Sequence, residues 1–146
     1  MNKKISGSFQ HAWVYFIPSK SPLLNFFYRG GHGHAFILMQ LNDNWITIDP
    51  RPYFISIQEL GNIAKNVKVP DILLKSYKKI YPNVKMIEVR KPVRNLDKHK
   101  FPVVKLMIPR LNNCVSFIKY FFDLKGLIFI PSQLYKRLLK GETNGW

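Results

Sequence analysis

Three residues of this chain have side chains that could cooperate in nucleophilic catalysis: Cys114, His34 and Asp49. Cys114 is the single cysteine, and it follows Asn112 and Asn113. Either asparagine could cap a helix, because its side-chain oxygen accepts from the unpaired N–H groups of the first turn. Cys114 would then lie in that turn, where the helix dipole favours the nucleophilic thiolate. The alternative is a buried cysteine that packs as a small hydrophobic residue.

His34 and Asp49 lie on two apolar segments joined by residues 42–44 (Asn-Asp-Asn), a pattern typical of a β-hairpin. A turn centred on 42–43 pairs Gln40 with Trp45. Because strand side chains alternate between faces, His34 and Asp49 then share a face, with Cβ atoms at most about 7–8 Å apart. A carboxylate beside an imidazole fixes its tautomer and stabilises its protonated form.

Cysteine catalysis needs a thiolate, an imidazole that holds the proton, and a polar group that orients the imidazole. Cys114, His34 and Asp49 supply these three types of group. We therefore predict that the His34 ring lies between Cys114 and Asp49, within hydrogen-bond reach of both.

The elements expected around these residues follow from apolar spacing and from the positions of proline and glycine. We expect strands at 11–17, 34–41, 45–49, 53–57, 84–89 and 101–108, with a loop over 18–33 and a helical turn within 56–67. We expect helices at 70–81 and 131–140, and a third helix that starts near Cys114 and ends with Gly126 as its C′ residue. A single domain spans residues 1–146, with its core at about 9–140 and a frayed tail at 141–146.

Short motifs around these three residues also resemble those of a known group of enzymes. Gly33-His34-Ala35-Phe36 leads a strand, Asp49-Pro50 ends the next, and Asn113-Cys114-Val115-Ser116-Phe117 is similar to the start of a nucleophile helix. Together they resemble the circularly permuted papain-like enzymes, which include the permuted NlpC-type peptidases and amidases and the lecithin–retinol acyltransferase-like acyltransferases. The order histidine, acid, cysteine is the reverse of that in papain. The segment 129–135 also resembles small proteins of tailed phages that have the same order.

The resemblance covers roughly residues 34–138 and implies an α+β fold: a small antiparallel sheet with the nucleophile helix packed on one side. It also implies acyl chemistry through a thioester, in which Cys114 attacks a carbonyl, His34 takes and returns the proton, and Asp49 orients His34. The acyltransferase branch usually has a second histidine or another polar residue where this chain has Asp49. The oxyanion would be held by the Cys114 backbone N–H and a second donor, either Tyr15 or His11.

The Gly-His-Gly-His run at 31–34 raises the alternative of a metal site, since His32, His34 and Cys114 are possible zinc ligands. The chain has no Cys-x-x-Cys or His-Glu-x-x-His pattern. We therefore expect neither a metal nor another cofactor, place His32 in a loop, and expect His99, which lies among lysines, to be exposed.

The net charge of +15 suggests an anionic partner, such as nucleic acid, a membrane surface or an acidic polymer. The basic residues are spread along the chain without a nucleic-acid-binding motif, so we expect weak, non-specific binding. The N-terminal residues show no signal peptide and no apolar run approaches a membrane span, which favours a cytoplasmic or, for a phage protein, virion-associated location.

The function that we expect is a cysteine hydrolase or acyltransferase acting on an amide or peptide bond, with cell-wall material as one substrate. The alternative is a non-catalytic basic module with the same fold that binds nucleic acid or another anionic polymer.

Overall fold

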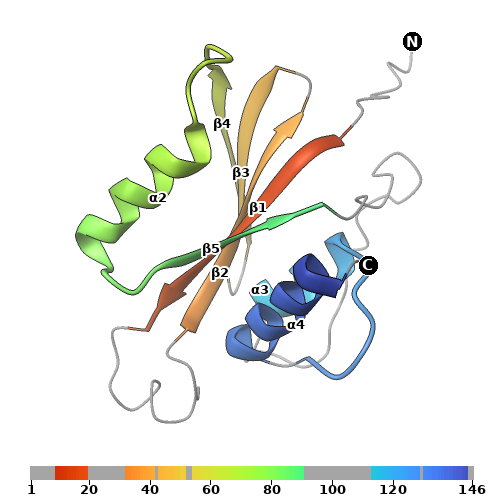
Figure 1. The fold of residues 1–146 in the computed structure, drawn as a ribbon. Coiled ribbons are helices and arrows are strands. Elements are labelled where there is room, and N and C mark those ends of the chain that lie inside the picture. The colour runs from red at the N-terminus through yellow and green to blue at the C-terminus, as the bar shows by residue number, and fades with distance from the viewer. Residues whose placement is uncertain are drawn as a thin grey trace.

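The protein was analysed as a computed structural model that describes residues 9–19, 32–41, 43–51, 54–90, 113–128 and 130–144. These residues form an α+β fold with a five-stranded antiparallel sheet in the order β4-β3-β2-β1-β5 (Figure 1). The strands are β1 (Phe9–Pro18), β2 (His32–Leu41), β3 (Asn44–Pro50), β4 (Ile55–Asn62) and β5 (Lys85–Val89). The helices of the described residues are α2 (Val69–Ile80), α3 (Asn113–Phe121) and α4 (Pro131–Asn144).

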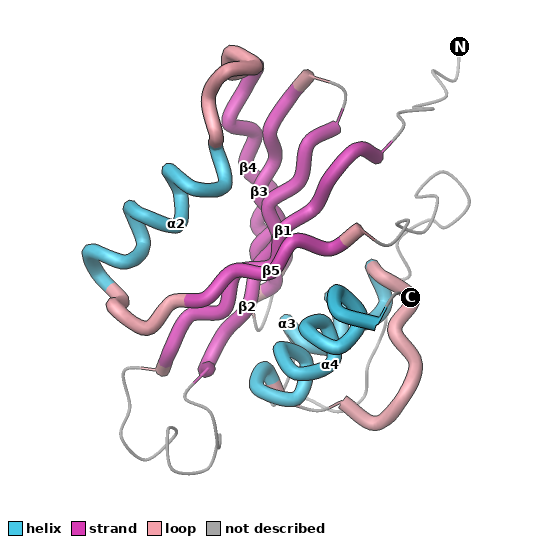
Figure 2. The backbone as a smooth tube through the Cα atoms, viewed as in Figure 1, coloured by secondary structure: helices cyan, strands magenta, loops and turns pink. Residues whose placement is uncertain are grey.

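The helices cover both faces of the sheet, as Figure 2 shows, with α2 on one side and α3 and α4 on the other. Alternation along β2 assigns its side chains to the two layers. Ala35, Ile37 and Met39 pack in the core with α3 and α4, whereas Phe36 and Leu38 pack beneath α2. β2 is therefore buried on both faces, which explains its nearly continuous apolar sequence.

The predicted hairpin is confirmed. Gln40 pairs with Trp45, and the register continues to the pair Ile37–Ile48. The predicted helix at 70–81 is also confirmed as α2, which has proline at its start. α3 begins at Asn113, so Cys114 lies in its first turn, and the helix packs on the sheet as expected.

The end of α3 differs from the prediction. The helix ends at Phe121, and Asp123, with φ 51°, takes the left-handed C′ position that we assigned to Gly126. The Leu124 N–H donates to the Lys119 carbonyl and the Asp123 N–H donates to the Tyr120 carbonyl. These two bonds form a Schellman motif, in which aspartate replaces the usual glycine.

Two other expectations differ from the structure. Most of the segment 56–67, where we expected a helical turn, is strand, because β4 occupies Ile55–Asn62 and pairs with β3; a single hydrogen-bonded turn follows, in which the Val67 N–H donates to the Ala64 carbonyl. The tail is shorter than predicted, because α4 continues to Asn144.

The expected strand at 101–108, His99 and most of the loop at 18–33 lie outside the described residues. In the described part of the chain, every helix is too short or too polar to cross a membrane.

Candidate functional site

The site begins at an irregularity in β2. Ile17 of β1 pairs with His34, but the next residue, Pro18, pairs with His32, which leaves Gly33 as an extra residue. Such a bulge shifts the alternation of side chains by one position. A Cβ atom at Gly33 would lie 2.7 Å from the Cβ of Ser19, so the close approach of the residue that follows β1 requires glycine at this position.

The bulge separates the two histidines. His32 turns toward the α4 layer, with its ring 5.5 Å from Phe16 and 5.2 Å from Tyr135. It is 4% exposed, and burial lowers its pKa, with a further contribution from Lys85. His32 is therefore a buried strand residue, and its predicted place in a loop was wrong.

His34 makes a direct contact with Asp49. Its Nε2 lies 2.5 Å from the Asp49 Oδ1, and the second carboxylate oxygen, Oδ2, lies 2.5 Å from Nη2 of Arg51. The His34 and Asp49 side chains are largely buried, at 24% and 19% exposed, whereas Arg51 is 52% exposed. Asp49 is thus held on both oxygens, and it fixes one ring nitrogen of His34.

Cys114 acts on the same imidazole. Its thiol, in a residue that is 8% exposed, contributes to raising the pKa of His34. Because Asp49 occupies Nε2, Nδ1 is the ring nitrogen that remains for the thiol. The β2–β3 pairing ends at Ile37 and Ile48, before His34 is reached, so His34 is paired with β1 through Ile17 but not with β3.

His34, Asp49 and Arg51 stabilise one another's charged forms. Burial by itself lowers the pKa of His34, but hydrogen bonds to Asp49 and Cys114 outweigh it and raise the pKa from 6.5 to about 9. Burial would raise the pKa of Asp49, but His34 and Arg51 outweigh it and hold that pKa below 3.8. At neutral pH the pair is therefore an imidazolium beside a carboxylate.

A cleft of about 520 Å³ opens beside this pair. Its lining comes from the ends of β1 and β2, from the end of β3 and the following residue, and from the C-terminal part of α2: Ile17, Pro18, Ser19, Gly33, His34, Asp49, Arg51, Tyr77, Ile80 and Tyr81. The imidazole of His34 is thus shared between the cleft and the thiol of Cys114. The structure brings His34 and Asp49 into direct contact, and Cys114 acts on the pKa of the same imidazole. The roles of the three residues in catalysis remain a proposal.

Sequence reasoning missed Arg51 and Tyr77. Arg51 had a visible signal, since it lies two residues after Asp49, where strand alternation gives it the same face. Tyr77 had no such signal. Its ring lies 5.2 Å from that of Phe36 because α2 packs across the sheet. Burial and Asp49 raise the pKa of Tyr77, so its hydroxyl remains a hydrogen-bond donor.

The two candidates for the second oxyanion donor are both wrong. The Tyr15 hydroxyl is buried and donates to the Pro70 carbonyl at 2.8 Å, and burial raises its pKa. Its ring stacks on Phe36 at 4.8 Å. Tyr15 therefore holds α2 on the sheet, and its hydroxyl is turned away from Cys114 toward the helix.

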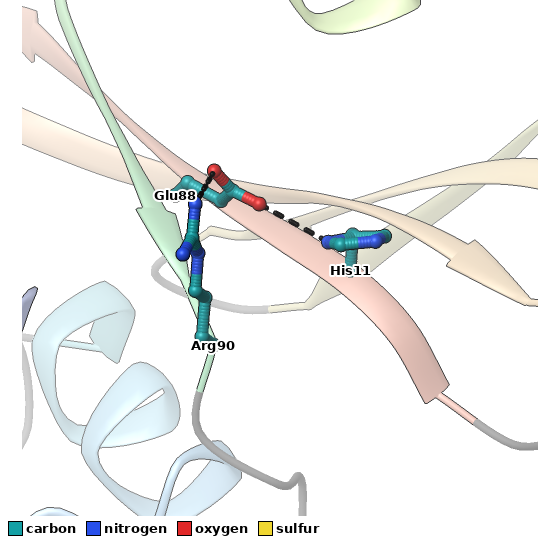
Figure 3. A network of polar contacts seen from close by, with 3 residues as sticks. All are labelled: His11, Glu88 and Arg90. Atoms are coloured by element: carbon teal, nitrogen blue, oxygen red, sulfur yellow. Dashed lines mark hydrogen bonds and ion pairs between the residues drawn. The ribbon is translucent and has the colours of Figure 1, made fainter.

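His11 lies at the other end of β1. It pairs with Gln40, whereas Ile17 pairs with His34, a separation of about 20 Å along the strand. Figure 3 shows His11 and Arg90 turned toward Glu88, with distances of 3.1 Å from Nδ1 of His11 to Oε1 and 3.4 Å from Nη2 of Arg90 to Oε2. This polar group is exposed and too far from Cys114 to hold an oxyanion.

No protein-family model, curated protein or solved structure matches this chain.

Proposed function

We propose that this protein is a cysteine hydrolase or acyltransferase that acts on an amide or peptide bond through a thioester. The observation that carries the proposal is the imidazole of His34, which is held by the Asp49 carboxylate and whose pKa the Cys114 thiol helps to raise. A structural cysteine does not require a histidine whose second nitrogen is fixed by a largely buried carboxylate.

The reaction follows from these contacts. In the reactive form the proton of the Cys114 thiol rests on His34, and this imidazolium stabilises the Cys114 thiolate by its opposite charge. The thiolate attacks the carbonyl carbon, and the C–N bond breaks as His34 gives its proton to the leaving nitrogen. Water or another acceptor then attacks the thioester, loses a proton to His34, and releases the Cys114 thiol.

The backbone supplies one donor for the oxyanion. Cys114 lies in the first turn of α3, where backbone N–H groups have no partner within the helix. Its own N–H can therefore donate to the developing oxyanion. The permuted papain-like fold belongs to the same proposal, since α3 packs on an antiparallel sheet and the residues follow the order His34, Asp49, Cys114.

The test is trapping by a cysteine-directed acylating probe, with circular dichroism to verify folding. Cys114→Ala should abolish trapping, and His34→Ala should remove nearly all of it. Asp49→Ala should leave a residual rate, because an orienting group acts through the base. His11→Ala is the matched control and should react like the wild type. A folded His34→Ala variant that reacts as fast as the wild type would exclude His34 as the base.

A second candidate function is a basic binding module without catalysis. It is favoured by the charge of +15 and by exposed lysines on helices of both layers, among them Lys75, Lys78 and Lys79 on α2 and Lys136 and Lys140 on α4. The pH profile of alkylation by iodoacetamide distinguishes the two. Rapid alkylation of Cys114 well below about pH 8 supports the enzyme, and the profile of an ordinary thiol, with a midpoint near 8.5, supports the module.

A further inference from the structure

We propose that Arg51 and Tyr77 form a subsite in the cleft that binds a carboxylate carried by the acyl substrate. This inference rests on the proposed function, because it names the class of substrate that Cys114 would attack. The cleft is lined by His34, whose imidazole also interacts with the Cys114 thiol, and by Arg51, which contacts the Asp49 carboxylate that holds His34.

The polar groups of the cleft favour an anion at this point. Arg51 lines the cleft, is half-exposed, and presents a planar set of five N–H donors that matches a carboxylate. Its contact with Asp49 neutralises the acid that would otherwise repel an anionic substrate. With His34 protonated, the lining carries a net positive charge at neutral pH.

Tyr77 supplies a neutral donor from α2. It lines the same cleft, and Asp49 and Arg51 both influence its hydroxyl. Ile17 and Ile80 add apolar surface to the lining. A substrate that fits has a carboxylate at one end, a short apolar spacer, and the reacting carbonyl at the other end.

The order of the contacts suggests the length of that spacer. The His34 ring and the Asp49 carboxylate link the site of the thiol to Arg51, with contacts of 2.5 Å from Asp49 to His34 and to Arg51. We therefore expect a carboxylate on a longer spacer to reach Arg51 better than one directly next to the reacting carbon.

A series of haloacetamides tests this proposal. N-iodoacetyl derivatives of glycine, β-alanine, 4-aminobutyrate and 6-aminohexanoate would be compared with their primary amides, and the ratio of Cys114 alkylation rates, acid over amide, would be measured. Free glutathione supplies the reference ratio. We expect the ratio for Cys114 to exceed this reference for the longer spacers. Arg51→Gln should then lower it by about fivefold, a modest factor because Arg51 is half-exposed.

Arg137→Gln is the matched control, since this exposed arginine lies on α4, on the other side of the sheet, and its loss makes the same change in net charge. Its ratio should equal that of the wild type. Tyr77→Phe should lower the ratio less than Arg51→Gln does. An unchanged ratio in Arg51→Gln, together with fast and His34-dependent alkylation by the neutral probes, would overturn the subsite and leave the proposed function standing. Alkylation of Cys114 no faster than that of glutathione by every probe would overturn both.

Discussion

The proton on His34 should stabilise the folded protein, and its loss at alkaline pH should weaken it. The pKa of His34 is raised from 6.5 to about 9 in the folded state. Each pKa unit corresponds to about 1.4 kcal/mol, so the free energy of unfolding contains about 3 kcal/mol from this group. Because the folded state binds the proton more tightly than the unfolded chain does, this contribution is fully present below about pH 6.5 and disappears as the pH rises through about 9.

The assay is urea denaturation of the wild type and of His34→Gln between about pH 5.5 and 10. The difference between the two free energies of unfolding cancels the titration of lysines and tyrosines that the proteins share. We expect this difference to change by about 3 kcal/mol across the range, in the direction of a less stable wild type at high pH.

The histidine ring signals in NMR spectra measure the same pKa directly. The His34 signal should titrate near 9 in the wild type and at lower pH in Asp49→Asn and in Cys114→Ala, because each variant loses a hydrogen bond that raises the pKa. A His34 midpoint near 6.5 in the folded wild type, or a stability difference that is flat with pH, would refute the imidazolium–carboxylate pair.

Three further predictions test the elements around the site. Gly33→Ala should destabilise the protein by about 1–3 kcal/mol in thermal or urea unfolding, because the added Cβ would lie 2.7 Å from the Cβ of Ser19 and the bulge would have to move. Tyr15→Phe should lower the free energy of unfolding by about 1–2 kcal/mol, because the buried Pro70 carbonyl loses the Tyr15 hydroxyl as a donor. The alkylation rate of Cys114 should match that of the wild type, and a large loss of rate in the folded variant would show that Tyr15 acts in the site. Binding to nucleic acid, followed by fluorescence anisotropy, should weaken steeply with salt and vanish at physiological ionic strength, whereas tight, salt-resistant binding to one sequence would favour the non-catalytic module.

The sequence predicts local features whose causes are themselves local. The register of the β2–β3 hairpin follows from two apolar segments joined by an Asn-Asp-Asn turn, and the pair Gln40–Trp45 occurs as expected. Pro70 and Pro82 bracket α2 because proline fits the first turn of a helix and the residue before a proline avoids the helical region. The place of Cys114 in the first turn of α3 follows in the same way from the preceding asparagines.

Other features depend on contacts between distant segments. β4 contains apolar and polar residues in a pattern that suits a helical turn or an edge strand, and only its hydrogen bonds to β3 decide between them. Tyr15 is a plausible oxyanion donor by position alone, until α2 brings the Pro70 carbonyl within 2.8 Å of its hydroxyl. The left-handed C′ position at the end of α3 is likewise occupied by Asp123 and not by Gly126, against the usual preference for glycine at that position.

The separation of His32 from His34 illustrates both contributions. The two histidines are two residues apart in the sequence, and regular alternation along a strand would give them the same face. The bulge at Gly33 sends His32 into the α4 layer and leaves His34 with Asp49 and Cys114. A bulge arises from the pairing of β2 with β1, so residue types and spacing determine which groups are present, while strand pairing determines which of them meet.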